Sequence, residues 1–207
     1  MTLTLRYMTQ YDVPVVAATD KMVFDMPWAA SSYSYEVNSS PYSYMSVLDA
    51  AERAEPKGWK RLLPNFGDDA QSCIVAYGGM WCIQSEAHIS TIATHPDWQR
   101  RGFGEVVFAS MIQRAINLAA EYIVLEVRAG NASAQQLYLK YGFTVAGVKK
   151  GYYKNTGEDA YDMRLDLARE GVLTNFRTLY QVITTRHDFV DKYSNTPRPK
   201  HRNLDLF

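Results

Sequence analysis

A turn that contains two glycines, at residues 99–104, constrains the fold of this chain more than any other feature of its sequence. It follows an alternating strand pattern at residues 88–94 and opens the longest helical pattern, at residues 102–120. Glycines in such a turn let backbone N–H groups approach a phosphate, and the helix N-terminus adds partial positive charge. The turn lacks the Gly-Lys-Ser/Thr of a Walker loop and the third glycine of a dinucleotide fingerprint. It therefore predicts either a phosphate site of another kind or a purely structural turn.

The other patterns predict a mixed α/β fold rather than an alternating, doubly wound sheet. We expect strands at residues 3–7, at 122–127 (buried on both faces), at 144–148 and at 161–167, and a hairpin over 72–85 that turns at Gly78-Gly79. We expect helices after an N-cap at Thr9, over residues 45–54, and from Asn131 to about Tyr141, where Gly142 ends the helix. Residues 27–44 are rich in Tyr, Ser and Pro. They predict an aromatic loop or a pair of short helices, which either packs as a lid or contacts a substrate.

The chain changes character after Leu167. Residues 168–207 carry seven Lys/Arg and four Asp/Glu, and residues 172–190 have a helical pattern. We therefore predict one domain over residues 1–167 and a C-terminal extension over 168–207, made of a helix and a loose basic tail.

Composition excludes several classes of protein. Twenty-two Lys/Arg balance twenty-two Asp/Glu, so no global charge favours nucleic acid or an anionic membrane as a partner. The longest apolar runs are too short to span a bilayer, and the first residues lack the order of a signal peptide. Cys73 and Cys82 fit neither a zinc site nor a disulfide framework, so we expect a cytoplasmic protein without a metal.

Several ordered motifs resemble the GNAT acetyltransferases, and among them the RimI-like ribosomal-protein-alanine N-acetyltransferases. The resemblance extends from about Leu3 to Leu167 and is densest between His88 and Asp166. The motifs that carry it are His95-Pro96-Asp97-Trp98-Gln99-Arg100-Arg101-Gly102-Phe103-Gly104, Leu125-Glu126-Val127-Arg128, Asn131, Ala134, Leu137-Tyr138, Tyr141-Gly142-Phe143 and Gly151-Tyr152-Tyr153. It implies a mixed, mostly antiparallel sheet with two central parallel strands that splay apart, flanked by helices.

The resemblance also implies where acetyl-CoA binds. The pantetheine arm would pair with the backbone of the strand at residues 88–94, and the pyrophosphate would bind the amides that open the long helix. Glu105 departs from this pattern, because a carboxylate adds negative charge near phosphates, so we expect its side chain to point away. Asn131 would contact the cofactor, although a plain N-cap explains it equally well. The implied cofactor-binding residues are Ile92, Ala93, Thr94, Arg100, Arg101, Gly102, Phe103, Gly104, Glu105 and Asn131.

Two residues match the catalytic groups of the family. Glu126 matches its proton acceptor and Tyr138 its proton donor. Acetyl transfer needs a neutral amine, and an N-terminal amine titrates near pH ~7.7–8, so a base helps the reaction. Glu126 lies in an apolar strand, where we expect desolvation to raise its pKa. The alternatives are an ion pair between Glu126 and Arg128 and a packing role for Tyr138.

The resemblance implies direct transfer of the acetyl group of acetyl-CoA to an amine, most directly the N-terminal α-amine of a protein or peptide. No cysteine lies near the proposed centre, which argues against a covalent acetyl-enzyme. A small-molecule amine acetyltransferase and a non-catalytic acyl-CoA-binding module stay open as alternatives, and we expect a monomer or a homodimer. His88 and Ser90 share a strand face with Ile92 in the expected pattern. They either line the acceptor side or, for His88, serve as a structural histidine. Trp28, Tyr33, Tyr152 and Tyr153 are further candidates for that side.

Overall fold

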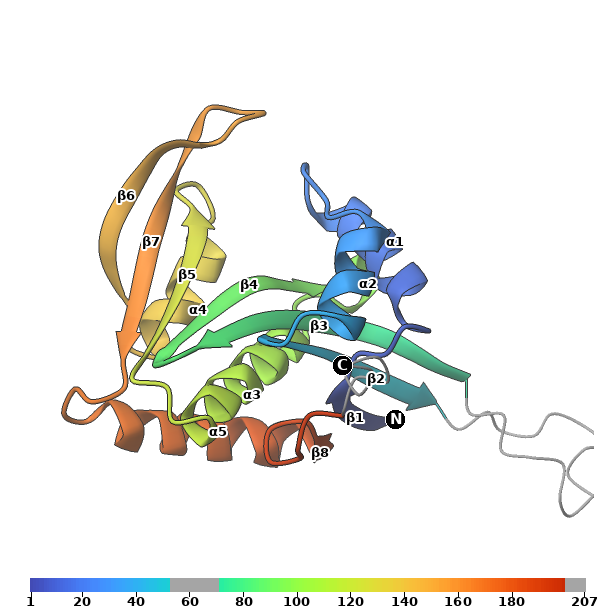
Figure 1. The fold of residues 1–207 in the computed structure, drawn as a ribbon. Helices are drawn as coiled ribbons and strands as arrows, with labels where there is room; N and C mark the ends of the chain where they lie inside the picture. The colour runs from blue at the N-terminus through green and yellow to red at the C-terminus, as the bar shows by residue number, and fades with distance from the viewer. Residues whose placement is uncertain (53–70, 200–207) are drawn as a thin grey trace, which may run out of the picture.

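The computed structural model describes residues 1–52 and 71–199, which form one sheet with helices on both faces (Figure 1). The strands are β1 Thr2–Tyr7, β2 Ser43–Glu52, β3 Gln71–Ile83, β4 Glu86–Thr94, β5 Tyr122–Arg128, β6 Thr144–Tyr153, β7 Glu158–Asp166 and β8 Phe189–Lys192. The helices are α1 Val13–Val23, α2 Ala30–Asn38, the short 3-10 helix η2 Pro96–Trp98, α3 Phe103–Asn117, α4 Ala132–Lys140 and α5 Val172–His187.

The sheet is mixed and mostly antiparallel, as predicted. Its strand order is β6-β7-β5-β4-β3-β2-β1-β8. Neighbouring strands are antiparallel except for two pairs, β4 with β5 in the centre and β1 with β8 at one edge. Figure 1 shows β5, β7 and β6 diverging from β4 and β3 at one end of the central parallel pair.

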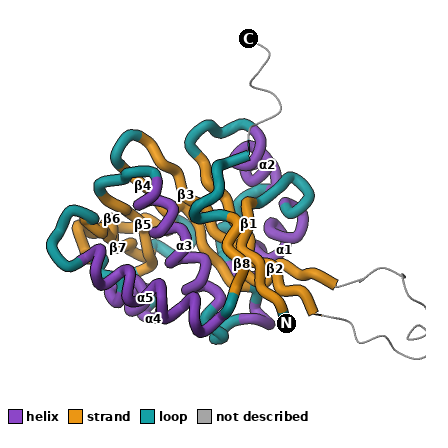
Figure 2. The backbone as a smooth tube through the Cα atoms, turned by 90° about the horizontal axis from the view of Figure 1, so that it is seen from below, coloured by secondary structure: helices purple, strands orange, loops and turns teal. Residues whose placement is uncertain are grey.

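Each face of the sheet packs on its own group of helices. Helices α3, α4 and α5 contribute Phe108, Tyr138 and Phe176 to the larger hydrophobic cluster, and Figure 2 shows these helices together on one side of the strands. Helices α1 and α2 contribute Val16 and Tyr33 to a smaller cluster on the other face. Complete burial of a side chain such as Phe108 contributes about 1.5–3 kcal/mol, so both clusters fix the sheet relative to its helices.

The helix predicted for residues 45–54 is wrong, because this segment forms β2. The strand pairs with β1 on one side and β3 on the other. Its Met45 and Val47 pack in the cluster under α1 and α2, whereas Leu48 and Ala50 pack in the cluster under α3. A strand that is buried on both faces has no clean two-residue alternation, and its apolar residues imitate a helical pattern. Residues 53 and 54 lie outside the described part of the chain.

The predicted turn at Gly78-Gly79 is also wrong, since β3 continues through both glycines. The chain turns instead at residues 84 and 85, where Gln84 has a φ of 54°. Gly78 lies under α3, and a Cβ at this position would come within 2.8 Å of Val107 and 2.9 Å of Met111. The glycine allows close packing of helix on sheet.

Two smaller expectations need correction. Strand β5 alternates between buried and half-buried residues, so it is not buried on both faces. Thr9 is not the N-cap of α1, because the helix begins at Val13 after Asp12. The Asp12 carboxylate instead accepts hydrogen bonds from the backbone N–H and hydroxyl of Thr9. Asp12 fixes the turn before the helix rather than its first backbone groups.

The segment after Leu167 contains a helix, as predicted, and a strand that the sequence did not reveal. Helix α5 ends at His187, and β8 then pairs in parallel with β1. Beyond β8, Tyr193 is completely buried and donates a hydrogen bond to the carbonyl of Tyr44. The described part of this segment packs on the sheet, whereas its separation as a distinct extension stays a prediction.

Candidate active site

The central feature of the site is the point where β4 and β5 part. The two strands pair at only three positions, which end at His88 and Val124. Beyond this point β4 keeps its pairing with β3, and β5 keeps its pairing with β7. Among the residues that the structure describes, the β5-facing backbone of residues 89–94 therefore has no strand partner. An extended ligand can pair with it as an added strand does.

The predicted pantetheine residues lie along this unpaired edge, on alternating faces of β4. The strand has a register irregularity opposite Gly79 and Met80, next to Ser90. After it, Ile92 packs on the cluster under α3, whereas Ala93 packs with α1 and α2. His88 packs against Trp81 and shares no face with Ile92. The expectation that these two residues share a face is wrong, because the irregularity shifts the alternation.

The glycine-containing turn leads from β4 into the N-terminus of α3. Arg100 has a φ of 61° and Gly102 a φ of 86°, so the turn uses two left-handed residues. The first N–H groups of a helix lack acceptors within the helix, and Gly102 at the N-cap has no side chain to cap them. These groups and the helix dipole can attract an anion at this end of α3, beside the unpaired edge of β4.

The charged residues of this turn differ in their contacts. The Arg101 guanidinium lies 4.7 Å from the centre of the Trp98 ring and donates to the carbonyl of Asp97. Arg100 has no hydrogen bond or ion pair with the described residues, so its charge is available to a ligand. The Glu105 carboxylate is held toward α4, 2.6 Å from Lys140 Nζ. That contact agrees with a side chain directed away from the expected phosphates.

Glu126 lies on β5 just past the parting of the strands and has two basic partners. Its Oε2 is 2.8 Å from His88 Nε2, and its Oε1 is 2.5 Å from Lys149 Nζ on β6. The hydrogen bond with His88, together with Lys149, lowers the pKa of Glu126 to about 2. Our expectation of a raised pKa is wrong, because these partners outweigh desolvation. The alternative pairing with Arg128 is also wrong, since Arg128 pairs with other carboxylates.

Arg128 joins three parts of the chain near the end of β5. Its guanidinium lies 3.1 Å from Asp25, which follows α1, and 3.0 Å from Glu158 at the start of β7. It also lies 3.8 Å from the centre of the Tyr153 ring on β6. The segment between α1 and α2 is thus connected to the hairpin of β6 and β7.

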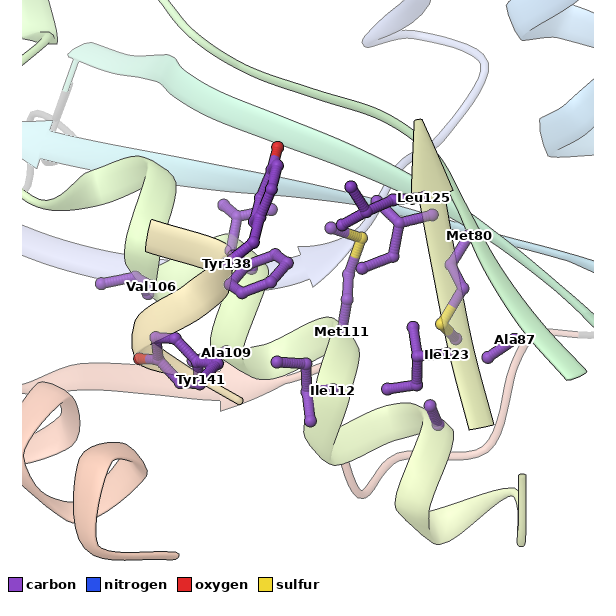
Figure 3. Close-up of a cluster of buried hydrophobic side chains, with 14 of the residues drawn as sticks. Met80, Ala87, Val106, Ala109, Met111, Ile112, Ile123, Leu125, Tyr138 and Tyr141 are labelled. Carbon is purple, nitrogen blue, oxygen red and sulfur yellow. The ribbon is translucent and has the colours of Figure 1, made fainter. Parts of the chain in front are cut away.

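Tyr138 reaches the centre of the fold from α4. Its ring packs against Phe108 and Phe143, and the residue is 6% exposed. Burial raises the pKa of its phenol to about 12, so the hydroxyl keeps its proton at neutral pH. Figure 3 shows this hydroxyl directed away from the surrounding apolar side chains, and no hydrogen bond joins it to the described residues. Tyr138 can therefore donate a proton, whereas the Tyr141 hydroxyl is occupied by Glu105.

Asn131 serves as the N-cap of α4. Its side-chain oxygen accepts a hydrogen bond from the backbone N–H of Ala134 at 3.1 Å. A cofactor contact of Asn131 stays a prediction.

A group of aromatic side chains packs around His88, the hydrogen-bond partner of Glu126. Trp28 stacks on Trp81 at 6.2 Å between ring centres, and Trp81 contacts the His88 ring at 5.4 Å. Tyr33 is completely buried, packs against Trp28 and donates a hydrogen bond to Asp20. It therefore holds the aromatic group in place and is not exposed to a substrate. Tyr152 and Tyr153 pack on each other on β6.

Sequence reasoning missed Lys149 and Trp81 as neighbours of the site. Lys149 reaches Glu126 only because β7 lies between β5 and β6 with the observed register. No local pattern carries that information. The alternation of β3 placed Trp81 on a strand, but it did not show which residue faces His88.

No metal centre or membrane span is found in residues 1–52 and 71–199. No group of three or more His, Cys, Asp or Glu side chains there could hold a metal ion. No helix of this part of the chain is long and apolar enough to cross a bilayer.

Comparisons with known proteins agree with this geometry. Residues 23–143 match the model of the acetyltransferase (GNAT) family. The chain is 28% identical over 159 residues to a putative [ribosomal protein bS18]-alanine N-acetyltransferase of Bacillus subtilis, covering 77% of this chain and 92% of that protein. It is 33% identical over 106 residues to the [ribosomal protein bS18]-alanine N-acetyltransferase of Escherichia coli, covering 50% of this chain and 72% of that protein.

A crystal structure of the ribosomal-protein-S18-alanine N-acetyltransferase from Escherichia coli has a similar fold. It aligns with a TM-score of 0.64 at 23% identity, covering 82% of this chain and 97% of that one.

Proposed function

The chain belongs to the GNAT acetyltransferase family, and from this premise we propose that it acetylates the N-terminal α-amine of a protein or peptide. As a member of this family it is an N-acetyltransferase that uses acetyl-CoA. The names of its bacterial relatives support the finer assignment, since two of them are named as alanine N-acetyltransferases of the ribosomal protein bS18, one of these as putative.

One observation carries the proposal: β4 and β5 part after His88, beside the uncapped N-terminus of α3. The unpaired backbone of residues 92–94 fits an extended pantetheine arm. The turn of Arg100, Arg101, Gly102, Phe103, Gly104 and Glu105 fits a pyrophosphate. Both features lie at consecutive points along the chain, so one long ligand can occupy them together.

Acetyl transfer needs one proton transfer from the amine and one to the leaving thiolate. We assign these to residues beside the point where β4 and β5 part. Glu126 serves the proton transfer from the amine, since it is the carboxylate that matches the proton acceptor of the family and it lies where β4 and β5 part. Tyr138 serves the side of the leaving thiolate, because its buried phenol keeps its proton and has no competing acceptor among the described residues.

The bond that forms joins the amine nitrogen to the acetyl carbon, and the bond that breaks joins that carbon to sulfur. No covalent acetyl-enzyme is needed when the amine attacks directly.

The relatives also support a place of action in the cytoplasm, because they are named for a ribosomal substrate. A monomer or a homodimer stays our prediction for the oligomeric state.

A thiol-release assay with a peptide library and a set of small amines tests the proposal. We expect release of CoA thiol with peptides that have a free N-terminus. We expect none with the same peptides after their N-termini are blocked. Turnover of polyamines or other small amines alone would replace the proposal with a small-molecule acetyltransferase. Binding of acetyl-CoA without any turnover would favour a non-catalytic module.

A further inference from the structure

The ring of His88 occupies the point at which β4 and β5 part. His88 belongs to the last residue pair between these strands, and Glu126 lies two residues beyond its pair partner Val124. Their side chains are 26% and 15% exposed, so both are partly shielded and still reach solvent. A ligand that enters at the parting of the strands meets the imidazole and the carboxylate together.

We propose that the proton of the acceptor amine passes first to His88, while Glu126 orients the imidazole and stabilises its charged form. The inference rests on the proposed acetyl transfer and refines its first step. It assigns His88 a catalytic role instead of the structural role that was one of the two readings of its sequence pattern.

The hydrogen bond between the two residues fixes the tautomer of the ring. A carboxylate can only accept hydrogen bonds, and the low pKa of Glu126 keeps it ionised at neutral pH. His88 Nε2 must therefore carry a hydrogen, which leaves Nδ1 as the basic nitrogen. No hydrogen bond joins Nδ1 to residues that the structure describes. A perpendicular contact with the Trp81 ring, 5.4 Å between ring centres, also restrains the imidazole. A carboxylate on one nitrogen and a free lone pair on the other is the arrangement of an oriented general base.

The basicity of the two groups favours this division of roles. An N-terminal amine titrates near ~7.7–8. A carboxylate with a pKa of about 2 is roughly 10⁵–10⁶-fold less basic than such an amine, so direct transfer to it is strongly uphill. Imidazole is the side chain whose charge changes near neutrality, so it accepts the same proton at a much smaller cost.

Other charged groups face this pair from neighbouring elements. Lys149 on β6 contacts Glu126 and lies 3.7 Å from Asp162 on β7. Lys149 also lies 5.6 Å from the centre of the Tyr152 ring. On the side of α2, Glu36 accepts a hydrogen bond from the Trp81 indole. Lys149 contacts one oxygen of the Glu126 carboxylate and lowers its pKa, whereas His88 contacts the other oxygen.

The proton count closes with these residues. One proton leaves the ammonium for His88 Nδ1 and then reaches solvent. The nitrogen lone pair attacks the acetyl carbon, and the carbon–sulfur bond breaks with its electron pair on sulfur. Tyr138 gives its proton to the thiolate, and the second proton that the nitrogen loses then restores the Tyr138 hydroxyl. The products are an N-acetyl amide, the CoA thiol and one proton in solution.

The test compares His88→Gln, Glu126→Gln and the control Lys150→Met by the pH profile of kcat/KM between pH 5.5 and 9.5. An acetyl-CoA thermal shift is the check that each variant is folded. We expect the wild type to lose activity on the acidic side as the imidazole is protonated. His88→Gln should lose about 10²–10³-fold at pH 7, and the deficit should shrink above the pKa of the amine, where the amine needs no base.

The other two variants separate the roles of the pair. Glu126→Gln should still lose activity on the acidic side of the profile, and this acidic limb should move to lower pH. The reason is that loss of a neighbouring negative charge disfavours the protonated imidazole. Lys150→Met, a control that removes an ion pair at the surface of β6, should leave the limb in place. Added imidazole should restore part of the activity of His88→Ala.

Several outcomes would overturn the role of His88. The first such outcome is a rate and a pH profile of His88→Gln that equal those of the wild type. Loss of the acidic limb in Glu126→Gln but not in His88→Gln is another, and it would return the base to Glu126. If His88→Gln does not bind acetyl-CoA, the shift in Glu126→Gln and the imidazole rescue decide the question. Failure of the wild type to acetylate any peptide would instead overturn the proposed function, and it is seen before any variant is compared.

Discussion

Glu126 Oε1 and Lys149 Nζ lie 2.5 Å apart and join β5 to β6 across the intervening strand β7. Neither residue is near the other in sequence, and the pair exists only because of the order of the strands. Together with the hydrogen bond to His88, it lowers the pKa of Glu126 to about 2.

The pair predicts a loss of stability in acid. The pKa of Glu126 is about 2, below its ordinary 4.5, so its contribution to folding is complete above pH ~5. That contribution is lost as the pH falls from ~4.5 toward 2. We expect about 1–2 kcal/mol, less than the full shift because Lys149 is 40% exposed and screened by water.

Urea unfolding of the wild type and Glu126→Gln at pH 7 and pH 3 measures this contribution. The difference between the two proteins should be largest at pH 7 and clearly smaller at pH 3, where the unfolded chain already binds the proton but folded Glu126 is still mostly ionised. Lys150→Met, which removes an ion pair at the surface of β6, is the control and should show a smaller effect. A constant difference between wild type and Glu126→Gln would contradict the assigned pKa.

Tyr138→Phe should slow turnover without weakening acetyl-CoA binding. The change removes one hydroxyl that makes no hydrogen bond with the described residues, so packing against Phe108 and Phe143 is kept. We expect kcat to fall by roughly 10²–10⁴-fold, the usual effect of a positioned acid, with stability within about 0.5 kcal/mol. Tyr141→Phe is the matched control, because its hydroxyl contacts Glu105 instead. Equal turnover of Tyr138→Phe and the wild type would make Tyr138 a packing residue.

The two glycines of the turn should respond differently to substitution. A Cβ at Gly102 would lie 2.7 Å from His187 Nε2, and φ there is 86°, so Gly102→Val should damage the fold itself. A Cβ at Gly104 meets only the Thr94 hydroxyl, at 3.0 Å. Gly104→Val should therefore fold and still lose acetyl-CoA.

Thermal denaturation with and without ligand makes the comparison. Acetyl-CoA at one hundred times its Kd should stabilise the wild type by about 2.7 kcal/mol. The control Gly147→Ala, where a Cβ makes an ordinary 3.9 Å contact on β6, should keep this gain. An unchanged gain in Gly104→Val would place the cofactor elsewhere.

The sequence predicted elements that depend on a local pattern better than it predicted contacts between distant strands. The turn before α3, the cap of α4 at Asn131 and strand β5 could all be predicted, because each depends on a local pattern or motif. Strand β2 was mistaken for a helix because both of its faces are buried. Gly78 and Gly79 were mistaken for a turn because a close approach of α3 requires the same residue type. The partners of Glu126 could not be predicted, since they depend on strand order and register.

The C-terminal segment should be required for stability. Deletion of residues 189–207 removes β8 from the edge of β1 and exposes the surface that the buried Tyr193 covers. It also removes the Ser194 and Thr196 carbonyls that accept hydrogen bonds from Arg114, which would leave a buried charge unpaired. We expect a loss of at least about 3 kcal/mol in urea unfolding. Deletion of residues 200–207 alone is the control. Equal stability of the longer deletion and the wild type would show that the segment is dispensable.

The position of the new acetyl group tests the central claim most directly. The substrate is a peptide that begins with alanine and contains an internal lysine, incubated with the wild type and acetyl-CoA. Fragmentation by mass spectrometry then locates the modification. The account predicts a single acetyl group on the alanine α-amine and none on the lysine. Acetylation of the lysine alone, or of neither amine while small amines are acetylated, would contradict it.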